Sequence, residues 1–148
     1  MSQVTLLAAD RPLPLYDPGV RRVKIVQVND LPPHPQFRWK TPFTIRGEED
    51  GFSVQTHSYY RRSVDMLGLT IKPHQYELNL DATEQDAALL RNYLSQNCKP
   101  GEQVELWNLW VGDVDVRAFH LEGPLSDLDK DTLEQLFEKD QTCMTITI

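Results

Sequence analysis

Apolar and polar residues alternate most clearly in the C-terminal half of the chain. Tyr76, Leu78 and Leu80 alternate with Glu77 and Asn79, at the period of two that places successive side chains on opposite faces of a β-strand. Three further runs are rich in β-branched and aromatic residues. The pattern therefore predicts four strands in this half of the chain, at 75–80, 102–111, 114–121 and 143–148.

Two segments between these strands have helical periodicity instead. The first begins at Thr83, which is followed three positions later by Asp86 in the manner of a helix cap, and it ends near 99–101. The second follows Gly123-Pro124 and has acidic residues in its first turn. Their apolar stripes consist of Ala87, Leu90, Tyr93 and Leu94, and of Leu128, Leu133, Leu136 and Phe137.

The predicted order strand-helix-strand-strand-helix-strand resembles the ferredoxin-like split β-α-β topology, within the α+β class. A turn at Gly112-Asp113 would pair the two middle strands as a hairpin, with Trp107 opposite Ala118. We expect the sheet face that carries Trp107, Leu109 and Val111 to lie under the helices. The opposite face then needs a second cover, either the N-terminal half or another subunit, over Val104, Leu106, Phe119 and Leu121.

The N-terminal half has weaker patterns. Residues 1–20 contain three prolines and are expected to form an extended arm outside the core. The segment 21–71 is β-rich: it should contain a strand at 21–28 and a hairpin of 41–46 with 52–60, whereas 63–71 fits a strand or a helix equally well. These segments are expected to pack on the 72–148 unit as an extension, within one cooperative domain.

Composition limits the classes of function. The chain has 148 residues, 40% hydrophobic and 25% charged, as in a globular protein. The formal net charge of −7 disfavours nucleic acid and anionic membrane surfaces, and no apolar run approaches the roughly 20 residues that span a bilayer. The start lacks the basic region of a signal peptide, and Cys98 and Cys143 are expected to be free thiols. A cytoplasmic location is therefore predicted.

No motif in the sequence predicts a metal, a cofactor or a catalytic nucleophile. Four acids match calcium-loop positions, but Thr132 stands where the loop needs glycine, so acids at a helix N-terminus explain them better. The histidines lack metal-ligand spacing, and no phosphate-binding loop occurs. Stacking of RNA bases on Trp107 and Phe119 is disfavoured, because the predicted strand pairing places these two aromatic residues on opposite faces of the sheet. The four acids are Asp127, Asp129, Asp131 and Glu138.

One segment combines aromatic and cationic side chains at the end of a predicted strand, and it is the candidate binding site. It consists of His57, Tyr59, Tyr60, Arg61 and Arg62. Arginine forks there could engage a carboxylate, a phosphate or an acidic partner segment, although solvated arginines at a strand end have the same pattern. We expect a non-enzymatic protein-interaction module, for example an inhibitor or immunity-type factor, with an unknown partner or self-association through the second sheet face. The alternative is a small-molecule-binding protein or modest enzyme with a pocket near 57–62.

Overall fold

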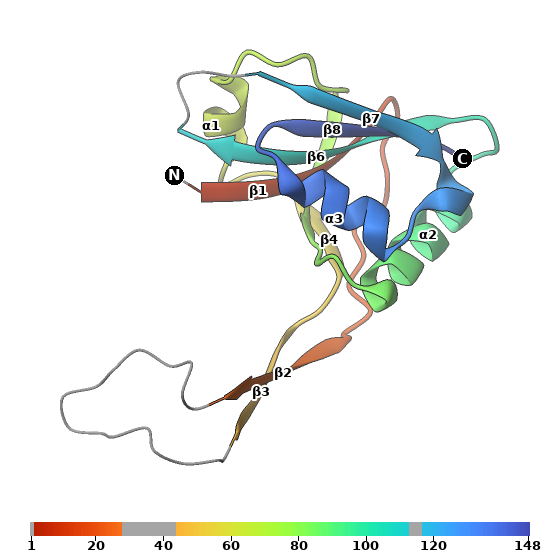
Figure 1. Cartoon of the computed structure of the whole chain (residues 1–148). Helices are drawn as coiled ribbons and strands as arrows, with labels where there is room; N and C mark the ends of the chain where they lie inside the picture. The colour runs from red at the N-terminus through yellow and green to blue at the C-terminus, as the bar shows by residue number, and fades with distance from the viewer. Residues whose placement is uncertain (1, 28–43, 113–116) are drawn as a thin grey trace. The chain divides into compact units, whose positions relative to one another are not determined.

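The computed structural model describes residues 2–27, 44–112 and 117–148. The chain divides into two units, Met1–Pro18 with Phe52–Ile148, and Gly19–Gly51. The first unit is a mixed sheet of six strands in the order β4-β5-β1-β6-β8-β7 (Figure 1). Its strands are β1 (Ser2–Ala9), β4 (Ser53–Thr56), β5 (His74–Asn79), β6 (Gln103–Val111), β7 (Phe119–Pro124) and β8 (Thr142–Thr147). Its helices are α1 (Arg61–Asp65), α2 (Glu84–Asn97) and α3 (Lys130–Glu138), with a 3₁₀ turn η2 (Leu125–Asp127). The α+β class is therefore confirmed.

The second unit is an antiparallel pair of strands, β2 (Arg21–Gln27) and β3 (Thr44–Asp50). Arg21 lies opposite Asp50 and forms an ion pair with it. The strand expected at 21–28 is thus confirmed up to Gln27. The hairpin expected from 41–46 and 52–60 is wrong, because β3 pairs with β2 whereas β4 pairs with β5 in the large sheet. Residues 28–43, and with them the start of that expected hairpin, lie outside the described residues.

The strand β1 occupies the middle of the large sheet, between β5 and β6. Leu6, Leu7 and Ala8 are fully buried. The expectation that the whole of 1–20 forms an arm outside the core is therefore wrong for β1. Consecutive buried apolar residues are typical of a strand that is covered on both faces, and the prolines begin only at Pro12, after the strand has ended.

Both long helices begin at a side-chain cap, and the cap at Thr83 was predicted from the sequence. The Thr83 side chain accepts a hydrogen bond from the Asp86 amide at 3.1 Å, and Asp129 accepts one from the Thr132 amide at 2.9 Å. Because Asp129 is the N-cap residue of α3, its carboxylate has a structural role in starting the helix. The stripes expected in these helices are largely confirmed, since the following residues are fully buried: Ala87, Leu90, Leu94, Leu133 and Leu136.

The assignment of sheet faces is reversed relative to the sequence prediction. Val104 and Leu106 lie in the same core cluster as the buried residues of α2 and α3, which cover one face of the sheet. Trp107 and Leu109 lie on the other face, where Val64 of α1 packs (Figure 1). Alternation separates the two faces of a strand correctly, but it does not say which face receives the helices. Residues of the segment 60–71 cover the Trp107 face, so the second cover lies on the face opposite to the one expected.

The strand order also differs from the ferredoxin-like expectation. Trp107 pairs with Leu6 of β1 and Cys143 of β8, so its expected pairing with Ala118 is wrong. The strand β8 lies between β6 and β7, and β7 runs parallel to β8 at the edge of the sheet. The apolar residues of β8 favour an inner position, because they are buried from both sides. Residues 113–116, which contain part of the expected turn and strand, lie outside the described residues.

Candidate functional site

His57 follows directly after β4 and is buried, with 2% of its side chain exposed. Its Nδ1 lies 3.0 Å from Oε1 of Glu77 on β5, so the imidazole donates to a carboxylate on the neighbouring strand. The Nε2 atom is also buried, and it has no hydrogen-bond partner among the described residues. His57 therefore acts as an internal link between two strands and does not present its ring on the surface.

The two tyrosines of the candidate segment have different environments. Tyr59 is 84% exposed, whereas Tyr60 is half-buried and packs against the core cluster that contains Val64. Their rings meet edge to face, with centroids 4.8 Å apart and an interplanar angle of 84°. This aromatic contact holds the exposed ring of Tyr59 beside an anchored one.

The helix α1 presents Arg61 and Arg62 to solvent. It is held to the sheet by Val64, which is 2% exposed, and it ends before Gly68, whose φ of 69° is readily adopted by glycine. Neither guanidinium group has a hydrogen bond or an ion pair with any described side chain, although Asp65 is on the same short helix. Within the described part of the protein, both cationic groups are therefore available to bind a ligand.

Met66 is the member of this surface that the sequence analysis missed. It is 79% exposed, and its amide donates to the Arg62 carbonyl at 3.1 Å, which places the two residues one helical turn apart. The sequence signal for it is its position four residues after Arg62, which places the two side chains on one face only if the segment is helical. The pattern of 63–71 fits a strand or a helix equally well, so this spacing could not be used. We call Tyr59, Arg61, Arg62 and Met66 the arginine surface.

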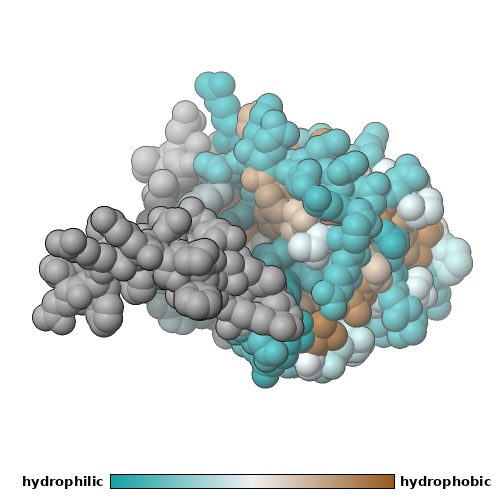
Figure 2. Space-filling view, turned by 60° about the horizontal axis from the view of Figure 1, so that its bottom comes forward, coloured by the Kyte–Doolittle hydropathy of each residue, from teal (hydrophilic) through white to brown (hydrophobic). Residues whose placement is uncertain are grey.

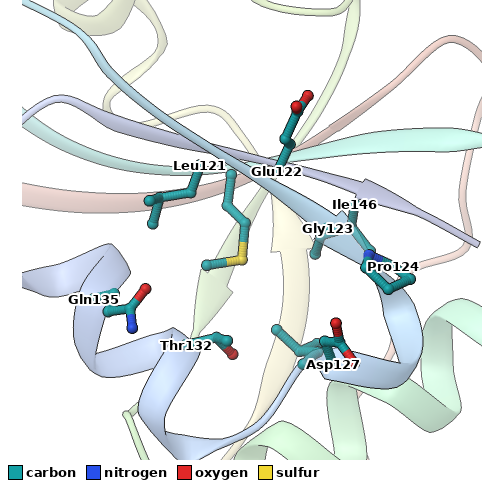
Figure 3. Close-up of a pocket in the computed structure, with 10 residues that line it drawn as sticks. Leu121, Glu122, Gly123, Pro124, Asp127, Thr132, Gln135 and Ile146 are labelled. Atoms are coloured by element: carbon teal, nitrogen blue, oxygen red, sulfur yellow. The ribbon is translucent and has the colours of Figure 1, made fainter.

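Three well-defined cavities among the described residues of the large unit are all lined by residues outside the candidate segment. The best defined has a volume of about 170 Å³ and lies between β7, β8 and α3 (Figure 3). We call it the β7 groove; its apolar lining includes Leu121, Leu128, Met144 and Ile146. In the view of Figure 2, the visible described surface is mainly hydrophilic, with apolar residues in small patches.

Catalytic nucleophiles and metal ligands have little support in the described residues. Cys98 and Cys143 are free, as expected, and both are buried. Burial raises the pKa of both thiols, that of Cys143 to about 12, so they are protonated and weakly nucleophilic near neutral pH. No group of three His, Cys, Asp or Glu residues in this part of the chain could hold a metal ion. None of the described helices is long and apolar enough to cross a membrane.

Comparison with protein-family models, curated proteins and solved structures finds no match to the chain. Two cationic forks beside an exposed aromatic ring and a flexible thioether can bind carboxylates and apolar side chains together.

Proposed function

We propose that the protein is a non-enzymatic interaction module that binds an acidic segment of a partner protein through the arginine surface. The observation that carries the proposal is the pair of exposed guanidinium groups without ion-pair partners among the described residues, between exposed Tyr59 and Met66. Tyr, Arg and Met are enriched in protein interfaces, and Tyr and Arg dominate binding energy there.

Charge supports an acidic partner. The chain has a formal net charge of −7, so Arg61 and Arg62 form a local cationic site on a protein of net negative charge. A carboxylate can accept two parallel hydrogen bonds from one guanidinium group, which fixes its orientation as well as its position. The partner would thus be selected by its acids and held by apolar contact with Tyr59 and Met66. The acidic net charge and the two free thiols suit an inhibitor or immunity-type factor that acts in a reducing cytoplasm.

The alternative, a small-molecule-binding protein or modest enzyme, requires the same residues to converge on a cavity. His57 instead faces Glu77 inside the sheet, whereas Tyr59 and the two arginines are exposed. The three well-defined cavities described above involve other residues. An exposed surface that lines none of these cavities favours a macromolecular partner over a small ligand.

The test is titration of the full chain against a fluorescein-labelled peptide of glutamates around one tryptophan, measured by fluorescence anisotropy. We expect binding that weakens with added salt, and no binding of the same peptide with lysine in place of glutamate. The double variant R61E/R62E should weaken binding at least about tenfold. The matched control is K99E/K130E, which shifts the net charge equally at two exposed lysines outside the arginine surface.

Equal losses of peptide affinity in the two double variants would show that binding depends only on the net charge of the protein, and would refute the proposed site. Failure of the acidic peptide to bind wild-type protein at low salt would refute the acidic partner class. Circular dichroism of each variant confirms that the fold is retained, which is expected because all four substituted side chains are exposed.

A further inference from the structure

The two edges of the six-stranded sheet are treated differently by the chain. The outer edge of β4 is paired with Tyr16, through hydrogen bonds of 3.0 Å from the Tyr16 amide to the Val54 carbonyl and 2.7 Å from the Val54 amide to the Tyr16 carbonyl. No described segment pairs with the outer edge of β7. An edge strand without a partner presents amide and carbonyl groups to another chain.

The direction of these groups follows from the pairing with β8. The Phe119 amide donates to the Gln141 carbonyl at 2.9 Å, so the main-chain groups of Phe119, and by alternation those of Leu121, face β8. The groups of His120 and Glu122 therefore point away from the sheet. Pro124, at the end of the strand, has no amide hydrogen and limits any added pairing to the residues before it.

The side chains of β7 alternate between the two faces of the sheet. Leu121 is opposite Met144 and Gly123 is opposite Ile146, so these β7 residues lie on the face of α3 and border the β7 groove (Figure 3). Phe119 is on the same face, 45% exposed, with the Lys139 ammonium 4.7 Å from its ring centroid. A side chain built at Gly123 would meet nothing within 4 Å. Open space above a glycine, next to an apolar groove, can accommodate an aromatic ring from a neighbouring strand.

We propose that β7 pairs antiparallel with β7 of a second copy of this chain, about a two-fold axis at Leu121. In that register, His120 of one copy lies opposite Glu122 of the other, twice, and their outward main-chain groups form the hydrogen-bonded pairs. Phe119 of each copy lies opposite Gly123 of the other and covers the β7 groove. The sheet becomes continuous across the two copies.

Charge selects this register and this occupant. A two-fold axis at His120 would place the two His120 side chains opposite each other, and an axis at Glu122 would do the same with two carboxylates. Only the axis at Leu121 places His120 opposite Glu122 while it also places Phe119 opposite Gly123. The edge of β7 is thus complementary to itself in hydrogen bonding, in charge, and in the fit of the Phe119 ring over Gly123. Such self-complementarity fits the closed two-fold interface of a homodimer. This surface is separate from the arginine surface, so the dimer does not depend on the proposed function.

A cysteine cross-link tests the register directly. Leu121 would face its own copy at a non-hydrogen-bonded position, where Cα atoms are about 4.5 Å apart, within the range that a disulfide spans. We expect L121C to form a disulfide-linked dimer under mild oxidation, seen on non-reducing gels, because the native thiols are buried. The matched control is S126C, which introduces an exposed thiol in η2 away from the axis and should stay monomeric on the gel.

A charge exchange provides a second test that leaves the core intact, because His120 and Glu122 are both exposed. Sedimentation velocity over a range of concentrations should show a reversible dimer of the wild-type chain. H120E places two acids opposite each other and should raise the dimer dissociation constant at least about tenfold, whereas H120E/E122K restores opposite charges and should return it to near the wild-type value. A wild-type chain that stays monomeric up to millimolar concentration would overturn the proposal. So would a dimer that neither H120E weakens nor L121C cross-links.

Discussion

His57 and Glu77 link two neighbouring strands of the sheet, with His57 Nδ1 3.0 Å from Glu77 Oε1. Because the imidazole is buried and its Nε2 has no partner among the described residues, Glu77 supplies its one hydrogen bond there. We predict that E77L lowers the free energy of unfolding by about 1–3 kcal/mol, since it leaves a buried donor unpaired. Urea unfolding measures this change.

The control for this prediction is E138L, which replaces an exposed glutamate near the end of α3. It should change the free energy of unfolding by no more than about 0.5 kcal/mol. If the two variants unfold at the same urea concentration, the contact between His57 and Glu77 has no structural role.

Asn108 is fully buried in β6 and connects the sheet to the end of α3. Its Nδ2 donates to the carbonyls of Leu136 and Lys139 at 3.2 and 3.0 Å, and its Oδ1 accepts from Gln3 at 2.8 Å. These bonds satisfy two carbonyls at the C-terminal end of α3, where no backbone amide of the helix is available to donate to them. We predict that N108L, of similar size, costs about 1–3 kcal/mol of stability, measured by urea unfolding. A neutral or stabilising outcome would mean that water replaces the amide without cost.

The elements that were predicted correctly are those with local signals. Thr83 marks the start of α2 because its cap bond reaches only three residues, and the alternation of β5 is complete within the strand itself. The position of β7 depends instead on whether it pairs with β6 or with β8. The free-energy difference between these two pairings comes from contacts between residues distant in the sequence. A short turn signal at Gly112 favoured the wrong neighbour. For the same reason, β1 was not recognised as the central strand, because its partners lie at 74–77 and 105–111.

The candidate site was predicted only as a segment. Residue types identified Arg61 and Arg62 as cations, but exposure depends on how Val64 fixes α1 against the sheet. His57 was grouped with them by sequence proximity, although the strand direction turns it towards Glu77. Met66 was omitted because the segment 63–71 fits a strand or a helix equally well, so its position relative to Arg62 was undefined. Adjacent residues thus divided between the interior and the surface, which local composition does not determine.

The two thiols give a prediction about reactivity. Burial raises the pKa of Cys143 to about 12 and also raises that of Cys98, so little thiolate exists at about pH 8. We expect the native chain to react very slowly with a chromogenic disulfide reagent. The urea-unfolded chain should react at once and release two equivalents of the coloured thiolate per chain, one for each free cysteine. Prompt reaction of one thiol in the native state would show that its site opens readily to solvent. C98S and C143S would then identify which one.

Arg11 and Glu102 give a prediction about acid stability. Arg11 Nε donates to Glu102 Oε2 at 2.9 Å and the Lys99 amide donates to Oε1 at 2.8 Å; the bonds from Arg11 above all lower the pKa of Glu102 below its ordinary 4.5. The folded state therefore binds a proton at this carboxylate less readily than the unfolded state. Its stabilising contribution is complete above about pH 4.5 and disappears as the pH falls through the lower, folded pKa.

Replacement of Glu102 by glutamine removes this titration. Urea unfolding of wild-type protein should lose stability between about pH 5 and about pH 3 more steeply than that of E102Q, whose acid limb is flatter. The effect should be modest, because the Arg11 side chain is 43% exposed and solvent screens the pair. E138Q serves as the control, since Glu138 is exposed and has no ion pair among the described residues. Parallel acid limbs for wild type and E102Q would show that the contact is equally satisfied by the protonated carboxyl, and that acid sensitivity arises at other groups.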